Sequence, residues 1–119
     1  MDPTREQRVS RLIGLGIRGR LAVVGVKQVR EAAKKGTLRF ALVAPDASHN
    51  SLDKVVPLLS ARHVPFTEVM SAEALGLATG RVAAAAVGIL DAKLAAGIRT
   101  AIEAGGEESA RGLGPDGAD

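Results

Sequence analysis

The chain has 119 residues, of which 46% are hydrophobic and 24% are charged, as expected for one folded domain. It contains no cysteine, which excludes disulfides, a thiol nucleophile and a zinc site built on thiolates. With two aromatic residues, Phe40 and Phe66, it is a poor match for a protein that stacks nucleic-acid bases on an aromatic platform.

Helical and extended patterns alternate along the chain. Apolar spacing and capping residues predict helices over residues 4–15, 26–35, 51–62, 72–79 and 92–104, with strands between them over 21–24, 38–44, 65–69 and 82–90. Pro57 falls inside the third helix, so this helix either kinks there or begins later. The strands are short apolar runs, typical of strands covered on both faces. The alternation predicts an α/β fold, a three-layer α/β/α sandwich.

The predicted domain occupies residues 4–104. Residues 105–119 are rich in glycine and acidic side chains and have little to bury, so we predict a disordered tail. The longest apolar run, 82–90, is far shorter than the roughly 20 residues of a membrane-spanning helix, and the charged N-terminus does not resemble a signal peptide. We therefore expect a cytoplasmic protein with no membrane segment, although the lack of cysteine also fits an exported one.

The positive charge is concentrated in the first third of the chain. Residues 1–40 carry ten basic and three acidic side chains (+7), residues 41–104 five and six (−1), and residues 105–119 one and four (−3). A concentrated basic surface suggests an anionic partner, most commonly RNA or DNA. The alternative is a solvated face without a partner.

Gly14, Gly16 and Gly19 match the GxGxxG string of dinucleotide-binding loops. Such a site needs a strand before the string and a helix after it, whereas the predicted order here is the reverse. The acidic residue expected about 20 positions further on is also missing, and Arg39 stands there. We interpret the glycines as a helix-to-strand connection.

The only histidines, His49 and His63, lack the spacing of metal ligands. His49 lies too close in sequence to Asp46 and Ser48 for the geometry of a catalytic triad. We expect His49 on the surface and His63 at the end of a helix. Asp46 follows a strand, where it either has a function or forms an Asx turn. We predict no catalytic residues, no metal and no cofactor, and therefore no enzyme.

The segment GVKQVREAAKKG, residues 25–36, has features of an RNA-binding edge. Gly25 permits close approach of the backbone to a partner, and the helix start that follows attracts phosphate. Lys27 can bond to phosphate and Gln28 to base edges. Arg30 and Lys34 are four residues apart and share a helix face. Many surface helices have the same composition, so an ordinary surface helix is the alternative.

A second segment, LATGRVAAAAVGI at residues 77–89, places a short loop before a predicted buried strand. The loop consists of Gly80, Arg81, Val82 and Ala83, which combine one cation with a small apolar surface. A simple tight turn is the alternative explanation.

Together, VVGVKQVREAAKKGTLRFALVAPDAS and VPFTEVMSAEALGLATGRVAAAAVGIL resemble the kink-turn RNA-binding ribosomal proteins of the large-subunit seven-Ae and thirty-e class, including small bacterial stand-alone members. The resemblance covers about residues 10–104. It implies an α/β/α sandwich around a four-stranded mixed sheet. It also implies that bent RNA is held between the start of the second helix and the loop before the last strand. The residues implicated in this way are Gly25, Lys27, Gln28, Gly80, Arg81, Val82 and Ala83.

By the same resemblance, Gln28 contacts the sheared G·A pairs of a kink-turn, and the loop packs against an extruded nucleotide. Arg30 and Lys34 are assigned to the RNA backbone on their charge alone. The sequence departs from the family pattern at Glu31, where relatives usually have lysine, and at Lys27, where the archaeal signature has asparagine. A carboxylate facing phosphate weakens binding.

The leading hypothesis is therefore a non-catalytic, monomeric RNA-binding protein, ribosomal or ribosome-associated. Its partner would be structured RNA such as ribosomal RNA or a kink-turn, with ribosomal proteins as further partners. The alternative is a protein-interaction scaffold of the same fold, in which Val82 and Ala83 face a protein.

Overall fold

The computed structural model describes residues 2–111, and for residues 104–111 only the course of the backbone. The helices and strands are α1 Pro3–Arg18, β1 Ala22–Val24, α2 Val26–Lys35, β2 Phe40–Val43, α3 His49–Ala61, β3 Phe66–Thr67, α4 Ala72–Thr79, β4 Ala86–Ile89 and α5 Ala92–Arg111. The strands form one four-stranded sheet in the order β1-β4-β2-β3. β4 is antiparallel to β1 and β2, whereas β2 and β3 are parallel, so the sheet is mixed.

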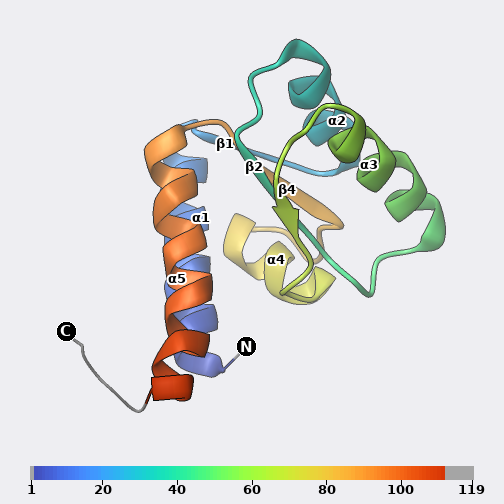
Figure 1. The fold of residues 1–119 in the computed structure, drawn as a ribbon. Helices are drawn as coiled ribbons and strands as arrows, with labels where there is room; N and C mark the ends of the chain where they lie inside the picture. The colour runs from blue at the N-terminus through green and yellow to red at the C-terminus, as the bar shows by residue number, and fades with distance from the viewer. Residues whose placement is uncertain (1, 112–119) are drawn as a thin grey trace.

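Alternate residues of the sheet belong to two different hydrophobic cores, because successive side chains of a strand point to opposite faces. Phe40 and Leu42 of β2 pack in the core formed with α1, α4 and α5. Ala41 and Val43 of the same strand pack in the core formed with α2 and α3. In Figure 1, α1 and α5 lie side by side on one side of the sheet, and α2 and α3 lie on the other. The predicted α/β/α sandwich is confirmed.

The helices with clear start and stop signals have the predicted bounds. α4 begins after Ser71, whose hydroxyl accepts a hydrogen bond from the N–H of Ala74 at 3.1 Å. α2 and α4 end at Gly36 and Gly80, which adopt the left-handed conformation (φ 75° and 79°). The prediction for α3 was wrong at its start, because the helix begins at His49, earlier than expected, and continues through Pro57.

The interpretation of Gly14, Gly16 and Gly19 as a connection between helix and strand was wrong for Gly16, whereas Gly14 lies in the helix, as the predicted range 4–15 also placed it. α1 extends to Arg18, so Gly14 and Gly16 are helical and only Gly19 caps the helix. Gly16 is buried, and a Cβ added to it would lie 2.6 Å from Cδ2 of Leu94 in α5. Glycine is therefore placed here for close contact between the two helices.

The observed strands are shorter than the predicted apolar runs, most clearly β4, which begins at Ala86 rather than at Val82. β4 begins where it first pairs with β2, at the pair of Ala86 with Val43. α5 continues to Arg111, beyond the predicted end at Ala104. Residues 112–119 of the predicted tail lie outside the described residues. Within the described residues, no helix is both long enough and apolar enough to cross a membrane.

Candidate nucleic-acid interface

The start of α2 leaves backbone donors open. Gly25, the residue before the helix, has φ 97° and ψ 157°, a conformation that is essentially restricted to glycine. No side chain in the described part of the chain caps this helix start. The first N–H groups of a helix have no partner within the helix, so those of α2 can bond to an anion. A Cβ added to Gly25 would meet nothing within 4 Å, which shows that the space in front of it is open.

Lys27 and Gln28 are exposed in the first turn of α2. They line one shallow cleft together with Glu31 and Lys35 from the following turns of the same helix. Glu31 is also exposed, so its carboxylate lies on the side of α2 that presents the two predicted RNA-binding side chains. The negative charge of Glu31 therefore lowers the positive potential at this end of the helix.

The loop of Gly80, Arg81, Val82 and Ala83 is supported by α4. The N–H of Arg81 donates to the carbonyl of Gly76 at 2.7 Å. Gly76 has no room for a side chain, because a Cβ there would lie 2.5 Å from Cα of Ala83. Val82 is 90% exposed, so the loop presents an apolar side chain to solvent from a fixed backbone.

The sheet brings these two segments to the same end of the molecule. Because β1 and β4 are antiparallel, the end of β1 lies opposite the start of β4, and Val24 pairs with Val87. The N–H of Gly25 then donates to the carbonyl of Ala86 at 2.8 Å. The start of α2 and the exit of the loop are therefore neighbours, although they are about 60 residues apart in the sequence.

Arg30 and Lys34 face α3 instead. Nη1 of Arg30 donates to the carbonyl of Lys54 at 2.5 Å, and Nη1 of Arg62 donates to the carbonyl of Lys34 at 3.3 Å. Lys54 and Arg62 were not predicted as part of this surface. The periodicity of one helix shows which of its residues share a face, but it does not show which other helix packs beside that face.

Asp46 has a structural partner that was not predicted. Its Oδ1 accepts a hydrogen bond from the N–H of Ala72 at 2.9 Å, which connects the end of β2 to the start of α4. His49 is exposed, and His63 follows the end of α3 with φ 58°, as expected for a residue that ends a helix. Among the described residues, no group of three or more His, Asp or Glu side chains could hold a metal ion.

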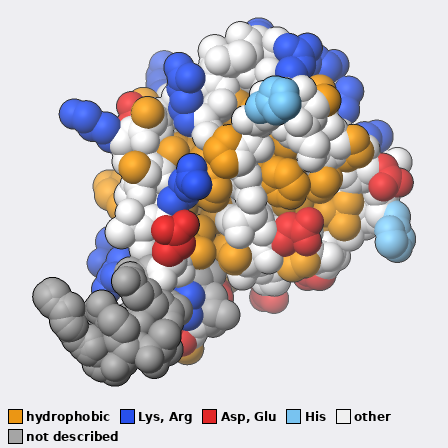
Figure 2. Space-filling view, in the orientation of Figure 1, with side chains coloured by type: hydrophobic (Ala, Val, Ile, Leu, Met, Phe, Trp, Pro, Cys, Tyr) orange, Lys and Arg blue, Asp and Glu red, His pale blue; other side chains and the backbone are white. Residues whose placement is uncertain are grey.

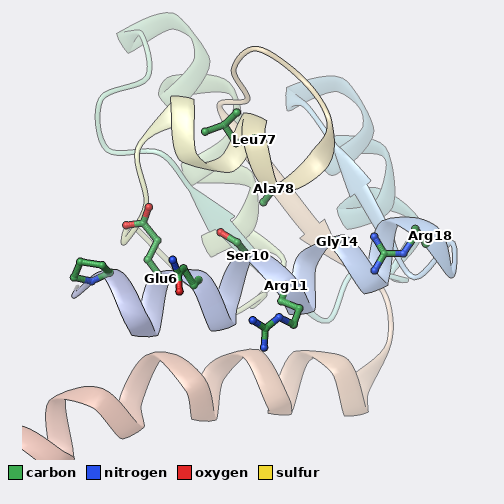
Figure 3. A pocket seen from close by; sticks show the side chains of 9 residues that line it. Glu6, Ser10, Arg11, Gly14, Arg18, Leu77 and Ala78 are labelled. Atoms are coloured by element: carbon green, nitrogen blue, oxygen red, sulfur yellow. The ribbon is translucent and has the colours of Figure 1, made fainter.

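A further open groove lies between α1 and α4, on the side of the sheet opposite α2 (Figure 3). Ser10, Arg11 and Arg18 line it from α1, and Leu77 and Ala78 from α4. Leu77 is 74% exposed. This groove was not predicted from the sequence, because the sequence does not show which side chains of α4 remain uncovered.

Comparison with known proteins identifies the family. The model of the ribosomal protein L7Ae/L30e/S12e/Gadd45 family matches residues 11–99. A protein of Geobacillus sp. (strain WCH70), named an RNA-binding protein, is 42% identical over 69 residues, which are 57% of this chain and 84% of that protein. An RNA-binding protein of Geobacillus thermodenitrificans (strain NG80-2) is 41% identical over 69 residues, with the same coverage of both chains.

Two solved structures share the fold. A protein of unknown function from Bacillus halodurans superposes with a TM-score of 0.74 at 24% identity, over 81% of this chain and 97% of that one. The Giardia lamblia 15.5kD RNA binding protein superposes with a TM-score of 0.69 at 16% identity, over 87% and 89%. These matches agree with the resemblance carried by the two sequence segments. The chain belongs to the ribosomal protein L7Ae/L30e/S12e/Gadd45 family.

Proposed function

We propose that this protein binds structured RNA of the kink-turn type, without catalysis, through the start of α2 and the loop of residues 80–83. The observation that supports this most directly is the hydrogen bond from Gly25 to Ala86, which sets an uncapped helix start beside a rigid, exposed loop. The Geobacillus relatives are named RNA-binding proteins, and they match 69 residues of this chain.

Each part of this surface has a distinct role in the proposal. The N–H groups of the first turn of α2 and the ammonium of Lys27 bind phosphate oxygens. The amide of Gln28 can donate and accept at once, so it can bond to the edges of sheared G·A pairs. Val82, 90% exposed, offers an apolar contact to a nucleotide that is turned out of the stack, and Arg81 adds a cation beside it.

Glu31 weakens this surface in the proposal, because its carboxylate repels phosphate. Glu31→Lys removes one negative charge and adds one positive charge. This variant is therefore expected to bind RNA more tightly, and its affinity should depend more steeply on salt concentration. An unchanged affinity in this variant would mean that RNA does not approach this side of α2.

The test of the proposal is binding to a kink-turn RNA and to the same RNA without its sheared G·A pairs, at two salt concentrations. We expect the protein to prefer the intact RNA. Gln28→Ala should reduce binding to the intact RNA by about tenfold to a hundredfold, the cost of one bidentate contact to bases, and should leave binding to the altered RNA nearly unchanged. Gln7→Ala, at an exposed position on α1, is the matched control and should change neither. Equal losses on both RNAs would contradict a specific role for Gln28.

We further propose that the protein acts as a monomer on the ribosome or with it, in the cytoplasm, with ribosomal RNA as the RNA and ribosomal proteins as further partners. The match to a ribosomal protein family supports this proposal. Sedimentation of the protein with ribosomal particles from its own cells, at low and high salt, tests it. Absence from every ribosomal fraction would contradict it.

A second candidate function is a protein-interaction scaffold, and two exposed apolar side chains favour it. Leu77 and Val82 are 74% and 90% exposed and are separated by only one turn and the loop. Capture of a defined partner from nuclease-treated lysate, lost in Leu77→Ser but kept in Gln28→Ala, would support this function. Retention of the partner by Leu77→Ser would contradict it.

A further inference from the structure

The groove between α2 and α3 is lined by cations from both helices. Lys27, Arg30 and Lys34 of α2 occur at spacings of three and four residues, so they lie on one face of the helix. Lys54 of α3 lines the same groove, where Glu31 is the one carboxylate among the lining residues. Figure 2 shows Lys and Arg side chains gathered at the upper right, over the end of the molecule that α2 and α3 form in Figure 1.

Two arginines connect α2 and α3 in opposite directions, Arg30 within this groove and Arg62 beyond its far end. Arg30 of α2 donates to a backbone carbonyl of α3, and Arg62, at the end of α3, donates to a backbone carbonyl of α2. A guanidinium has five N–H donors, and in each of these two arginines one N–H of Nη1 makes such a bond. The bonds hold both side chains in place without neutralising their charge, because a carbonyl carries no net charge. Binding of an anion then requires less ordering of the side chains.

The groove leads away from the proposed RNA interface. It begins at Lys27, in the first turn of α2, and follows the ten residues of this helix, a length of about 15 Å. Beyond the far end, Arg62 lines a second cleft, together with Arg39 and His63. No Asp or Glu is among the residues that line this second cleft. An RNA strand bound at the start of α2 therefore meets Lys27, Arg30 and Lys34 along α2, interrupted by Glu31, and further cations past the end of the helix.

We propose that the α2–α3 groove binds the sugar–phosphate backbone of the RNA segment that continues from the interface at Gly25 and Gln28. This proposal rests on the proposed function, and it adds Lys54 and Arg62 as residues that contact phosphate. Such contacts hold the RNA in register and contribute salt-dependent affinity, but they do not read sequence.

The test compares a kink-turn RNA that has a long flanking helix with the same RNA trimmed to the kink-turn. The double variant Lys54→Gln/Arg62→Gln, which removes two positive charges, should bind the long RNA more weakly and the trimmed RNA almost normally. For the long RNA, the slope of log affinity against log salt should fall by about 1.4–1.8, the value for two lost phosphate contacts. Arg62→Lys keeps the positive charge and should therefore have the same slope on the long RNA as the unmodified protein. Thermal unfolding of each variant shows whether the fold is intact.

The matched control is Arg8→Gln/Lys93→Gln, which removes two exposed cations from α1 and α5 on the opposite side of the sheet. It should keep the slope of the unmodified protein. If both double variants lower the slope equally, or if Lys54→Gln/Arg62→Gln leaves it unchanged on the long RNA, the groove proposal is wrong and the proposed function stands. If the unmodified protein binds neither RNA, both proposals are overturned.

Discussion

Gly76 supports the candidate RNA-binding loop from beneath, although it is buried and cannot touch RNA. A Cβ at this position would lie 2.5 Å from Cα of Ala83, 2.6 Å from N of Ala83 and 2.7 Å from C of Val82. All three are backbone atoms, which have no other rotamer to adopt. To reach an ordinary contact of 3.4 Å, the backbone at Ala83 must retreat by 0.9 Å. Gly76→Ala is therefore expected to displace the loop.

The expected change in stability is the sum of two opposing effects. Alanine in a helix interior is favoured over glycine by about 0.5–1 kcal/mol, whereas overpacking of a closely packed site costs about 1–3 kcal/mol. For Gly76→Ala the clash with backbone dominates, and we expect a net loss of about 1–2 kcal/mol. At this chain length, that loss corresponds to a decrease in Tm of about 4–8 °C.

Gly97→Ala is the matched control, because Gly97 lies in α5 and a Cβ there meets nothing within 4 Å. It should be more stable than the unmodified protein by about 0.5–1 kcal/mol. Thermal and urea unfolding measure both changes, and binding to the kink-turn RNA should weaken in Gly76→Ala alone. If Gly76→Ala proves as stable as Gly97→Ala and binds RNA normally, the loop is not held by this contact.

Two further substitutions test the positions of single residues. Gly25→Ala should lower the free energy of unfolding by about 1–3 kcal/mol, because alanine does not readily adopt the backbone conformation of Gly25 although there is space for its side chain. Gly36→Ala is the control, since Gly36 is a left-handed glycine with similarly open space. Urea unfolding should show the larger loss of stability in Gly25→Ala. Asp46→Ala removes the acceptor for the N–H of Ala72 and should cost about 1 kcal/mol in thermal unfolding, whereas Asp53→Ala, at an exposed position in α3, should cost nearly nothing. A similar loss in both aspartate variants would mean that the bond to Ala72 adds no stability.

The parts of the fold that were predictable carry local signals. The bounds of α2 and α4 follow from Gly36, Ser71 and Gly80, which act on the adjacent backbone alone. The errors lie where a distant segment decides the outcome. Gly16 looks like a helix breaker, but it lies within α1, where its lack of a side chain leaves room for Leu94 of α5. Val82 looks like the start of a strand, but it has no neighbouring strand to pair with and stays exposed.

The candidate interface was predictable only in part for the same reason. The sequence shows that Gly25 and Gln28 stand at a helix start, and the resemblance to a family connects them with the loop. The periodicity alone does not bring the segments together, because that depends on the antiparallel pairing of β1 with β4. Lys54 and Arg62 were missed because their proximity to α2 is a matter of packing between helices.

The place of β4 in the sheet has a consequence for the time at which the interface forms during synthesis. β4 is the last of the described strands, yet it lies between β1 and β2 and is the strand that pairs with β1. While the ribosome has made only the first 80 residues, β2 and β3 can pair but β1 has no partner in the sheet. The long separation between β1 and β4 also makes their pairing a late and slow step. A nascent chain thus presents the cations of α2 before Ala86 reaches Gly25, so the proposed selective recognition of RNA requires the pairing of β1 with β4, whereas attraction of the cations to an anion does not.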